Sequence, residues 1–315
     1  MSKPTFDPGF TQQVGGVLRR AINKDGSFNV RRRRTRWKDV HPYLYVISIG
    51  WGQFFGLVFA SYLLVNTVFA GIYYSIGPNA LQGHGVEDNY GRFLSAFFFS
   101  AHTLTTVGYG NLSPNGTAPN VVASLEAMVG LMGFAVATGL LFGRISRPSA
   151  KIGFSANILV APYQNGSSMQ FRIVNLRPNM LMELEASVLL MTVDGPPGSL
   201  SRSYHRLTLE RDRVYYLPLT WTIVHPIDAS SPLHGKTAAD LERLQAEFLI
   251  LIKGYDDTFS QTVHARSSYR YDEITWNARF TSAFHIDAGG DVVLDVDEVS
   301  THTRLPSQAN SSQRN

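Results

Sequence analysis

The sequence predicts a membrane protein in which two spanning helices flank a re-entrant segment and an all-β soluble domain follows. Three observations predict this fold class. Asp, Glu, Lys and Arg are absent over residues 40–86, 93–125 and 127–143. Within the second of these stretches, a short apolar run leads into a Gly-containing segment. From residue 168 onward the chain is mixed and charged, with short strand-like runs between turns.

Two apolar segments have the length of membrane-spanning helices. A helix needs about 20 apolar residues to cross the hydrocarbon core, and residues 51–74 and 119–145 supply them. A cleaved leader is disfavoured, because its apolar part has only about 7–15 residues and lies nearer the N-terminus. Two buried helices of a soluble core are the remaining alternative, which the lack of charge over such lengths disfavours.

Basic residues flank both predicted spans on the same side. Ahead of the first span lie Arg19, Arg20, Lys24, Arg31, Arg32, Arg33, Arg34, Arg36 and Lys38. After the second span lie Arg144, Arg147 and Lys151. The connector between the spans carries only Arg92, offset by Glu87 and Asp88. Because cytoplasmic loops are enriched in Lys and Arg, this pattern predicts a multi-pass protein with both termini in the cytoplasm.

The chain divides into five predicted regions. A basic cytoplasmic arm covers 1–36 and an interfacial helix covers 37–49. The membrane domain covers 50–148, the soluble β domain 149–302 and a disordered tail 303–315. Residues 1–30 are also expected to be disordered, because they are polar or irregular. Each basic residue of the arm gains roughly 1 kcal/mol near an anionic leaflet, so we expect the arm to contact lipid rather than nucleic acid, with topology alone as the alternative reason for its charge.

The segment between the spans has two parts. Residues 93–105 are apolar but too short to cross the membrane, which predicts a half-helix that enters from one side. Thr106-Val107-Gly108-Tyr109-Gly110 follows. Irregular backbone at membrane depth occurs only where protein buries it or where it lines water. This pentapeptide is the sequence of K⁺ selectivity filters, in which backbone carbonyls replace the hydration shell of the ion.

The residue types of the pentapeptide suit such a filter. Successive carbonyls can aim at one axis when the backbone alternates in handedness, and Gly108 and Gly110 permit the left-handed conformations. We expect the carbonyls of Thr106, Val107, Gly108 and Tyr109 to bind K⁺, with the Val107 and Tyr109 side chains packed behind them. Because several copies are needed to surround an ion, the motif predicts a homotetramer. No cofactor is predicted, and K⁺ enters only as the permeant ion.

Beyond the filter, motifs in the second half of the chain carry a family resemblance. They are Asn175-Leu176-Arg177, Trp221-Thr222-Ile223-Val224-His225-Pro226-Ile227-Asp228, Ser231-Pro232-Leu233, Ala265-Arg266-Ser267-Ser268-Tyr269 and Asp272-Glu273-Ile274 with Trp276. Over residues 37–295 the chain resembles the inward-rectifier potassium channels, specifically their bacterial branch. The resemblance implies a slide helix, two spans around a pore helix, a cytoplasmic immunoglobulin-like β-sandwich and a place in the bacterial inner membrane. The strand-like runs agree with a sandwich, and residues 237–245 are the clear helical candidate there.

Two positions beside the filter depart from the pattern of many potassium channels. A Glu on the pore helix and an Asp after the last filter Gly are replaced by His102 and Asn111. A neutral pair cannot form the same carboxyl clamp, so filter support is expected to differ. Glu126 is the one Asp, Glu, Lys or Arg residue between residues 93 and 143, and its burial in lipid would be costly. We therefore expect Glu126 to face protein or water and to support the filter.

The second span carries a stripe that the resemblance assigns to the cavity and gate. Phe134, Thr138 and Phe142 recur at a helical spacing, and four Phe142 rings could close the path by excluding water. Strong rectifiers hold polyamines with a cavity acid whose position is Phe134 here, so strong block is not expected. Polyamines, Mg²⁺ and Ba²⁺ remain candidate blockers. Gly130 and Gly139 are either hinges or packing positions.

Basic residues near the inner membrane surface match positions where the family binds anionic phospholipids. These are Arg36, Lys38, Arg144, Arg147, Lys151 and Arg177. The resemblance implies that lipid modulates the channel, without giving the sign of the effect.

Other functional classes are disfavoured. A channel gated by a small cytoplasmic ligand would need a glycine fingerprint after a strand, which is missing. A non-conducting receptor would be expected if the filter glycines were missing, and they are present. An enzyme is disfavoured, because His225 and Asp228 have no nucleophile or clustered metal ligands with them. The chain has no Cys, which excludes disulfides and thiol catalysis.

Overall fold

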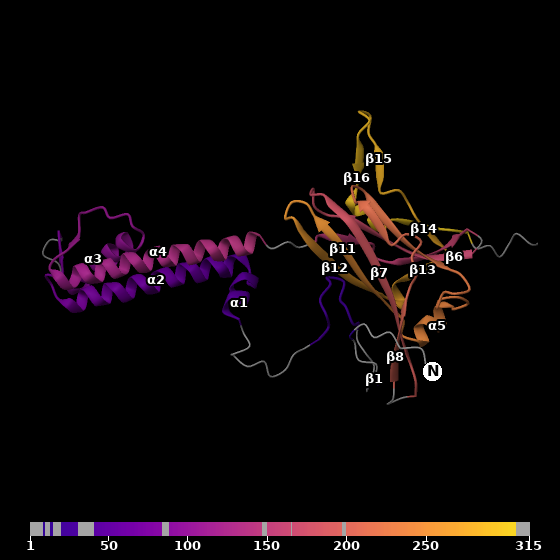
Figure 1. The fold of residues 1–315 in the computed structure, drawn as a ribbon, viewed down its shortest axis with the longest axis horizontal. Coiled ribbons are helices and arrows are strands. Elements are labelled where there is room, and N and C mark those ends of the chain that lie inside the picture. Colours follow the sequence, from indigo (N-terminus) through magenta and orange to yellow (C-terminus); the bar gives the residue numbers. More distant parts are fainter. Residues whose placement is uncertain are drawn as a thin grey trace, which may run out of the picture. The chain divides into compact units, whose positions relative to one another are not determined.

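A computed structural model describes residues 9, 13–14, 20–30, 41–83, 88–146, 150–164, 166–196 and 200–306 of the chain. The chain forms two compact units, one of residues Arg33–Arg147 and one that combines Met1–Arg32 with Pro148–Asn315. The first unit is helical and the second consists mainly of β-sheet (Figure 1).

The helical unit contains four helices and a short strand pair. Its elements are α1 (Pro42–Ser48), α2 (Trp51–Ile76), β2 (Leu81–Gln82), α3 (Asn89–Leu104), β3 (Ser113–Pro114) and α4 (Thr117–Ile145). Helices α2 and α4 are long and apolar enough to cross a membrane, with mean hydropathies of 1.9 and 1.8. Both spans were expected, although α2 ends later than residue 74 and α4 begins earlier than residue 119. Of the interfacial helix expected over 37–49, residues 37–40 lie outside the described residues.

Local signals explain where these helices begin and end. Pro42 occupies the first turn of α1, where its missing N–H has no helical partner to lose. Gly50 is extended and separates α1 from α2. The Asp88 side chain caps α3 by accepting from the Gly91 N–H at 2.8 Å. This cap lets α3 begin before residue 93, the start expected from the apolar run alone.

The three long helices meet at a small core and at one close backbone contact. Ala70, Tyr73, Leu81, Ala96 and Phe99 are buried together there. Near the end of α3, a Cβ placed on Gly130 of α4 would lie 2.1 Å from the Leu104 carbonyl oxygen. The approach of α4 to this point of α3 therefore requires glycine.

The β unit consists of two main sheets with a shared core. One sheet has the order β1-β8-β7-β11-β12, with β9 on β7, and the other has the order β10-β6-β5-β13, with β4 on β6. Strand β13 runs parallel to β5. Side chains from both sheets, including Phe171, Leu190 and Phe248, form one buried cluster. The expected sandwich-like all-β domain is thus confirmed.

The bounds of these elements follow the chain from residue 13 to residue 304. They are β1 (Gln13–Val14), β4 (Ile152–Phe154), β5 (Ile158–Tyr163), β6 (Gly166–Asn175), β7 (Leu181–Asp194), β8 (Leu200–Arg206), β9 (Arg213–Tyr216), β10 (Thr220–Ile227), α5 (Ala238–Arg243), β11 (Glu247–Asp256), β12 (Gln261–Arg270), β13 (Ile274–Trp276), β14 (Ala278–Phe280), β15 (Phe284–Ile286), β16 (Val292–Leu294) and β17 (His302–Arg304). Helix α5 is shorter than the helix expected over 237–245.

The expectation of disorder was wrong for parts of both termini. Strand β1 pairs with β8, and Thr303 and Arg304 pair with β14 as part of β17. Residues 20–30, the N-terminal segment, fold back on themselves, with the Asn23 N–H donating to the Ser27 carbonyl at 2.8 Å. Ile22 of this segment is buried against Met191 and Leu249. The remaining residues of the two expected disordered regions lie largely outside the described residues.

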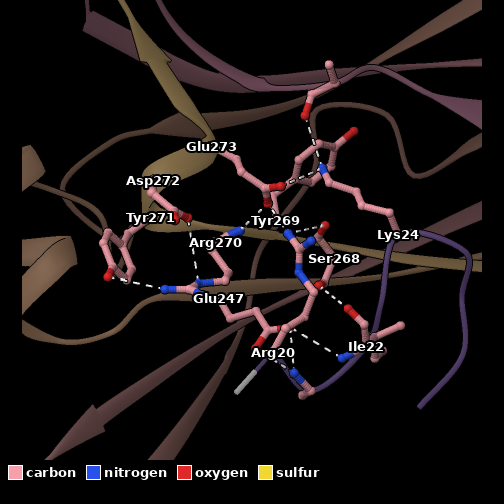
Figure 2. A network of polar contacts seen from close by, with 12 residues as sticks. Arg20, Ile22, Lys24, Glu247, Ser268, Tyr269, Arg270, Tyr271, Asp272 and Glu273 are labelled. Carbon is pink, nitrogen blue, oxygen red and sulfur yellow. Dashed lines mark hydrogen bonds and ion pairs between the residues drawn. The ribbon is translucent and has the colours of Figure 1, made fainter. Parts of the chain in front are cut away.

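Polar contacts hold the N-terminal segment to strands β11 and β12 (Figure 2). Glu247 accepts hydrogen bonds from the Ala21 N–H at 2.9 and 3.0 Å and from the Ile22 N–H at 3.4 Å. Glu273 forms ion pairs with Arg20 and, at 3.4 Å, with Lys24. Burial lowers the pKa of Lys24, and the charge of Glu273 opposes that shift. The segment is ordered because distant residues satisfy its polar groups.

Candidate functional site

The backbone that follows α3 is fixed by hydrogen bonds from its N–H groups to carbonyls at the end of α3. The Thr106 N–H donates to the Thr103 carbonyl at 3.0 Å, and the N–H groups of Val107 and Gly108 both donate to the His102 carbonyl, at 2.9 and 3.2 Å. Among the described residues, no hydrogen bond is accepted by a carbonyl of residues 106–110. Within the described residues, the N–H groups of residues 106–108 are engaged and the carbonyls of residues 106–110 are not, so these residues can offer a row of neutral oxygen ligands.

The handedness of this backbone alternates. Thr106, Gly108 and Gly110 have φ of 58°, 54° and 80°, whereas Val107 and Tyr109 do not have positive φ. The expected left-handed glycines are confirmed. Thr106 was not expected to join them, because a β-branched residue rarely has positive φ. Such a conformation costs about 1–3 kcal/mol and persists where the surroundings impose it, often at functional sites. The contacts with the end of α3 impose it here.

The side chains of the predicted filter residues are largely uncovered. Val107 is 52% exposed and Tyr109 is 73% exposed. The His102 ring lies edge-on to the Tyr109 ring, with centroids 4.8 Å apart. In the part of the chain that the structure describes, no hydrogen bond joins His102 to Asn111, whose backbone oxygen instead approaches Gly83. The structure thus brings His102 beside Tyr109 of the predicted filter and leaves Asn111 near Gly83.

Glu126 lies at the junction of α2, α3 and α4 and is wholly buried. Its Oε2 accepts from the Tyr73 hydroxyl at 2.8 Å, and its Oε1 contacts the Ser100 hydroxyl. Ser100 is also 3.0 Å from Asn66 Oδ1. Sequence reasoning identified Glu126 and missed the other three residues. Their common signal is a polar side chain inside a charge-free apolar segment.

The predicted cavity stripe lies on an uncovered face of α4. Phe134 and Phe142 are 75% and 70% exposed in this chain, and Thr138 is exposed between them. A Cβ on Gly139 would meet no neighbour within 4 Å. Gly130, by contrast, is wedged against Leu104. The contact with Leu104 supports a packing role for Gly130. A hinge role at either glycine stays a prediction.

The predicted lipid-binding residues have different surroundings. Arg144 donates to the Val46 carbonyl at 2.7 Å and the Ile49 carbonyl at 2.8 Å. Its guanidinium also stacks near the rings of Trp51 and Phe54, at 4.6 and 4.7 Å.

In the β unit, Lys151 and Arg177 lie at the same end of the β4–β6 pair, where the Leu176 N–H donates to the Lys151 carbonyl at 2.9 Å. Arg36, Lys38 and Arg147 lie outside the described residues.

His225 is a buried structural residue of the β unit. Its Nδ1 donates to the Thr208 carbonyl at 2.6 Å, and its Nε2 lies 2.8 Å from the Ser231 hydroxyl. Burial lowers the pKa of His225. Both ring nitrogens are therefore occupied by structural partners. Among the described residues, no group of three or more His, Asp or Glu side chains could hold a metal ion.

Comparisons with known proteins match both units. A model of the inward rectifier potassium channel C-terminal domain matches residues 152–315, and an ion channel model matches residues 53–147. The inward rectifier potassium channel Kirbac3.1 of Paramagnetospirillum magnetotacticum is 36% identical over 284 residues, which cover 88% of this chain and 93% of that protein. The G protein-activated inward rectifier potassium channel 3 of Homo sapiens is 29% identical over 308 residues, which cover 90% of this chain and 77% of that protein.

Proposed function

Because the chain belongs to the inward rectifier potassium channel family, we propose that it acts as a homotetramer that conducts K⁺ passively across the bacterial inner membrane, with both termini in the cytoplasm. In this proposal the carbonyls of Thr106, Val107, Gly108 and Tyr109 bind the permeant ion. The single observation that carries it is the alternating backbone of residues 106–110, whose carbonyls accept no hydrogen bond from the described residues.

The uncovered side chains support the tetramer. Val107 and Tyr109 flank the filter and expose 52% and 73% of their surfaces in one chain. A rigid filter needs these side chains packed, and neighbouring copies would supply the cover. An apolar cavity of about 860 Å³, lined by parts of α2 and α4 together with Thr105 and Thr106, opens beside the filter. Four chains around one axis would bury such surface and complete each ring of oxygens.

The gate is proposed at the inner end of α4. Phe142 is exposed and lies on the same helical stripe as Phe134 and Thr138. Four Phe142 rings around the axis would form a constriction that excludes water. We expect Phe142→Ala to increase flux. Gly139 has open space around it, which makes it the better candidate for a hinge than Gly130.

Anionic phospholipid is proposed as a modulator through the basic residues near the inner surface. Lys151 and Arg177 are the described members of this set that lie in the β unit. Arg144 has two of its nitrogens on protein carbonyls, so its contribution to lipid binding is expected to be smaller. Flux measured while anionic lipid is titrated into the vesicles gives the sign of the effect, and a flat response would contradict modulation.

The test is uptake of radioactive rubidium into liposomes that contain the purified full chain. We expect uptake that Ba²⁺ blocks and that external K⁺ suppresses more strongly than Na⁺. Gly108→Ala should abolish it, because Ala is strained at the φ of 54° found there. Gly71→Ala in α2 is the matched control, since its added methyl meets open space. Absence of K⁺-over-Na⁺ flux under every lipid condition would overturn the proposal.

A further inference from the structure

Four polar side chains are buried where α2, α3 and α4 meet. They are Asn66, Tyr73, Ser100 and Glu126, and we call them the junction cluster. Their exposed fractions are 0%, 1%, 0% and 0%. Buried polar groups of this kind are stable when every donor and acceptor has a partner. Each hydrogen bond within the cluster needs one proton, so the protons of the four side chains can be compared with the contacts between them.

The orientation of Asn66 is set by its own helix. Its Nδ2 donates to the Tyr62 carbonyl at 2.7 Å, so its Oδ1 is the atom that lies 3.0 Å from the Ser100 hydroxyl. Oδ1 can only accept. The Ser100 hydroxyl can donate to this oxygen or to Glu126 Oε1. We assign its proton to Asn66, because no other donor of the described residues reaches Asn66 Oδ1.

The remaining contact of Ser100 lacks a donor if Glu126 is ionised. Ser100 has one hydroxyl proton, and it is used on Asn66. The Tyr73 hydroxyl donates to the other oxygen of the carboxyl, Oε2, at 2.8 Å. The contact between Ser100 Oγ and Glu126 Oε1 would then place two acceptors against each other. One additional proton, on Oε1, completes the set.

We propose that Glu126 carries this proton, and that the resulting chain of hydrogen bonds makes Ser100 and Glu126 positioning residues of the filter. The chain runs from the Tyr73 hydroxyl to Oε2, from Oε1–H to Ser100 Oγ, from the Ser100 hydroxyl to Asn66 Oδ1, and from Asn66 Nδ2 to the Tyr62 carbonyl. The Tyr73 hydroxyl, the Glu126 carboxyl and the Ser100 hydroxyl then each have an acceptor for their proton. The positioning role rests on the proposed K⁺ filter, whereas the protonation state does not.

The electrostatic surroundings favour a neutral carboxyl. An unpaired charge inside a membrane span is costly. Among the described residues, the ion pairs all lie in the β unit, and none involves Glu126. Tyr73, from α2, is the titratable group in contact with the carboxyl, and α3 contributes the neutral Ser100. No ion-paired cation in the described part of the chain therefore offsets an ionised Glu126.

The junction cluster acts on the filter through α3. Ser100 lies next to the last turn of α3, where the Ala101 carbonyl accepts from Thr105 and the His102 carbonyl accepts from Val107 and Gly108. The first filter residues are hydrogen-bonded to these carbonyls. An axial shift or rotation of α3 would therefore change the direction of the filter oxygens. A chain of hydrogen bonds that ties Ser100 to α2 and α4 limits both movements.

The protonation state is tested by infrared spectroscopy on the full chain in membranes at neutral pH. The difference between wild type and Glu126→Gln should contain the carbonyl stretch of a protonated carboxylic acid. In Ser100→Ala that band should move, because Oε1–H loses its acceptor. A difference spectrum with carboxylate bands alone would overturn the proposal. The measurement needs no flux, so its failure is distinct from failure of the channel function.

The positioning role is tested by comparing how strongly external K⁺ and external Na⁺ suppress rubidium uptake. We call the quotient of these two effects the K⁺-over-Na⁺ ratio. Glu126→Gln should keep the wild-type ratio, because its amide N–H replaces Oε1–H and its carbonyl replaces Oε2. Ser100→Ala should lower the ratio roughly fivefold, the factor that corresponds to one hydrogen bond. A change in total flux at constant ratio would indicate a merely structural role.

A second variant covers the case in which Ser100→Ala does not assemble. Tyr73→Phe removes the hydroxyl and keeps the ring that packs edge-on against Phe99 at 5.1 Å. It should also lower the K⁺-over-Na⁺ ratio. The positioning role is wrong if Tyr73→Phe keeps the wild-type ratio, or if Glu126→Gln loses selectivity to the same extent as Glu126→Leu.

Discussion

Each unit of the molecule buries a glutamate where separate elements meet, and the two are satisfied differently. Glu126 in the helical unit is 0% exposed and meets the hydroxyls of Tyr73 and Ser100. Glu247 in the β unit is 3% exposed and meets the backbone N–H groups of Ala21 and Ile22. Backbone N–H groups can only donate, so they suit a carboxylate. The Tyr73 hydroxyl donates to Glu126, whereas Ser100 has one proton for two acceptors, Asn66 and Glu126. In our proposal the carboxyl therefore supplies a proton itself.

The two regions also share a glycine pressed against a backbone carbonyl. A Cβ on Gly130 would lie 2.1 Å from the Leu104 oxygen, and one on Gly26 would lie 2.8 Å from the Arg266 oxygen. Gly130 lies between two long helices that cannot separate locally. Gly26 lies in a turn of the N-terminal segment, which can leave the sheet as a unit. The same kind of contact is therefore expected to have different consequences when it is disturbed.

The largest effect is expected from Gly130→Ala. The added methyl overlaps the Leu104 carbonyl, so α4 must move away from the end of α3 that holds the filter. Overpacking of this kind costs about 1–3 kcal/mol or more. We expect loss of rubidium flux and a lower melting temperature of the assembled protein. Gly71→Ala in α2 is the control, because its added methyl meets no neighbour. A variant with wild-type flux and stability would show that this helix contact adapts, and would remove the contrast with Gly26.

A smaller and more local effect is expected from Glu247→Ala. The N–H groups of Ala21 and Ile22 lose their acceptor, at a cost of about 1–3 kcal/mol, and the N-terminal segment should detach from β11 and β12. Faster hydrogen exchange at these two amides and faster tryptic cleavage after Lys24 would report this. Glu247→Gln retains one acceptor oxygen, so its exchange and cleavage rates should lie between those of wild type and Glu247→Ala. Unchanged exchange would mean that Ile22 packing alone holds the segment.

A pH effect should separate the units, because His225 lies in the β unit. Its pKa is lowered by burial, whereas the unfolded chain binds that proton near the ordinary value of about 6.5. As pH falls below about 6.5 the unfolded state takes up the proton first, so stability present above that pH is lost on the way to the folded pKa. We expect the melting temperature of the β-sheet signal to fall between about pH 7 and pH 5.5.

The control for this pH effect is a pair of substitutions. His225→Gln should flatten the pH dependence, and the exposed His205→Gln should leave it unchanged. If both variants keep the wild-type slope, the acid sensitivity arises elsewhere in the chain.

The smallest effect is expected from Glu273→Gln. It removes the ion pairs with Arg20 and Lys24, whose side chains are 18% and 37% exposed. Pairs of this exposure contribute about 0.2–1 kcal/mol and are screened by salt. Tryptic cleavage after Lys24 should rise slightly at low salt and match wild type near 1 M salt. Asp272→Asn, which affects only Arg270 among the described ion pairs, should have no effect on this cleavage.

The parts predicted correctly from the sequence were those with local causes. Absence of charge predicts the spans, and glycine at alternate positions predicts the handedness at Gly108 and Gly110. Thr106 could not be predicted to be left-handed, because the carbonyls at the end of α3 impose that conformation. Tyr73 and Ser100 could not be linked to Glu126 before three helices were packed. The docked N-terminal segment depends on Glu247 and Glu273, which lie more than two hundred residues later in the chain.

Arg144 affects how the C-terminal end of α4 can move. One guanidinium holds the carbonyls of Val46 and Ile49, at the bend between α1 and α2. A small rotation of α4 about its axis would bend both of these hydrogen bonds. Hydrogen bonds weaken steeply as their angles depart from linearity, so the rotation is opposed until both bonds break. The Arg144 side chain is therefore expected to keep both hydrogen bonds or to lose both together. If the chain assembles into the proposed tetramer, each copy should change position in a step, and recordings from single channels should show abrupt sublevels rather than drift.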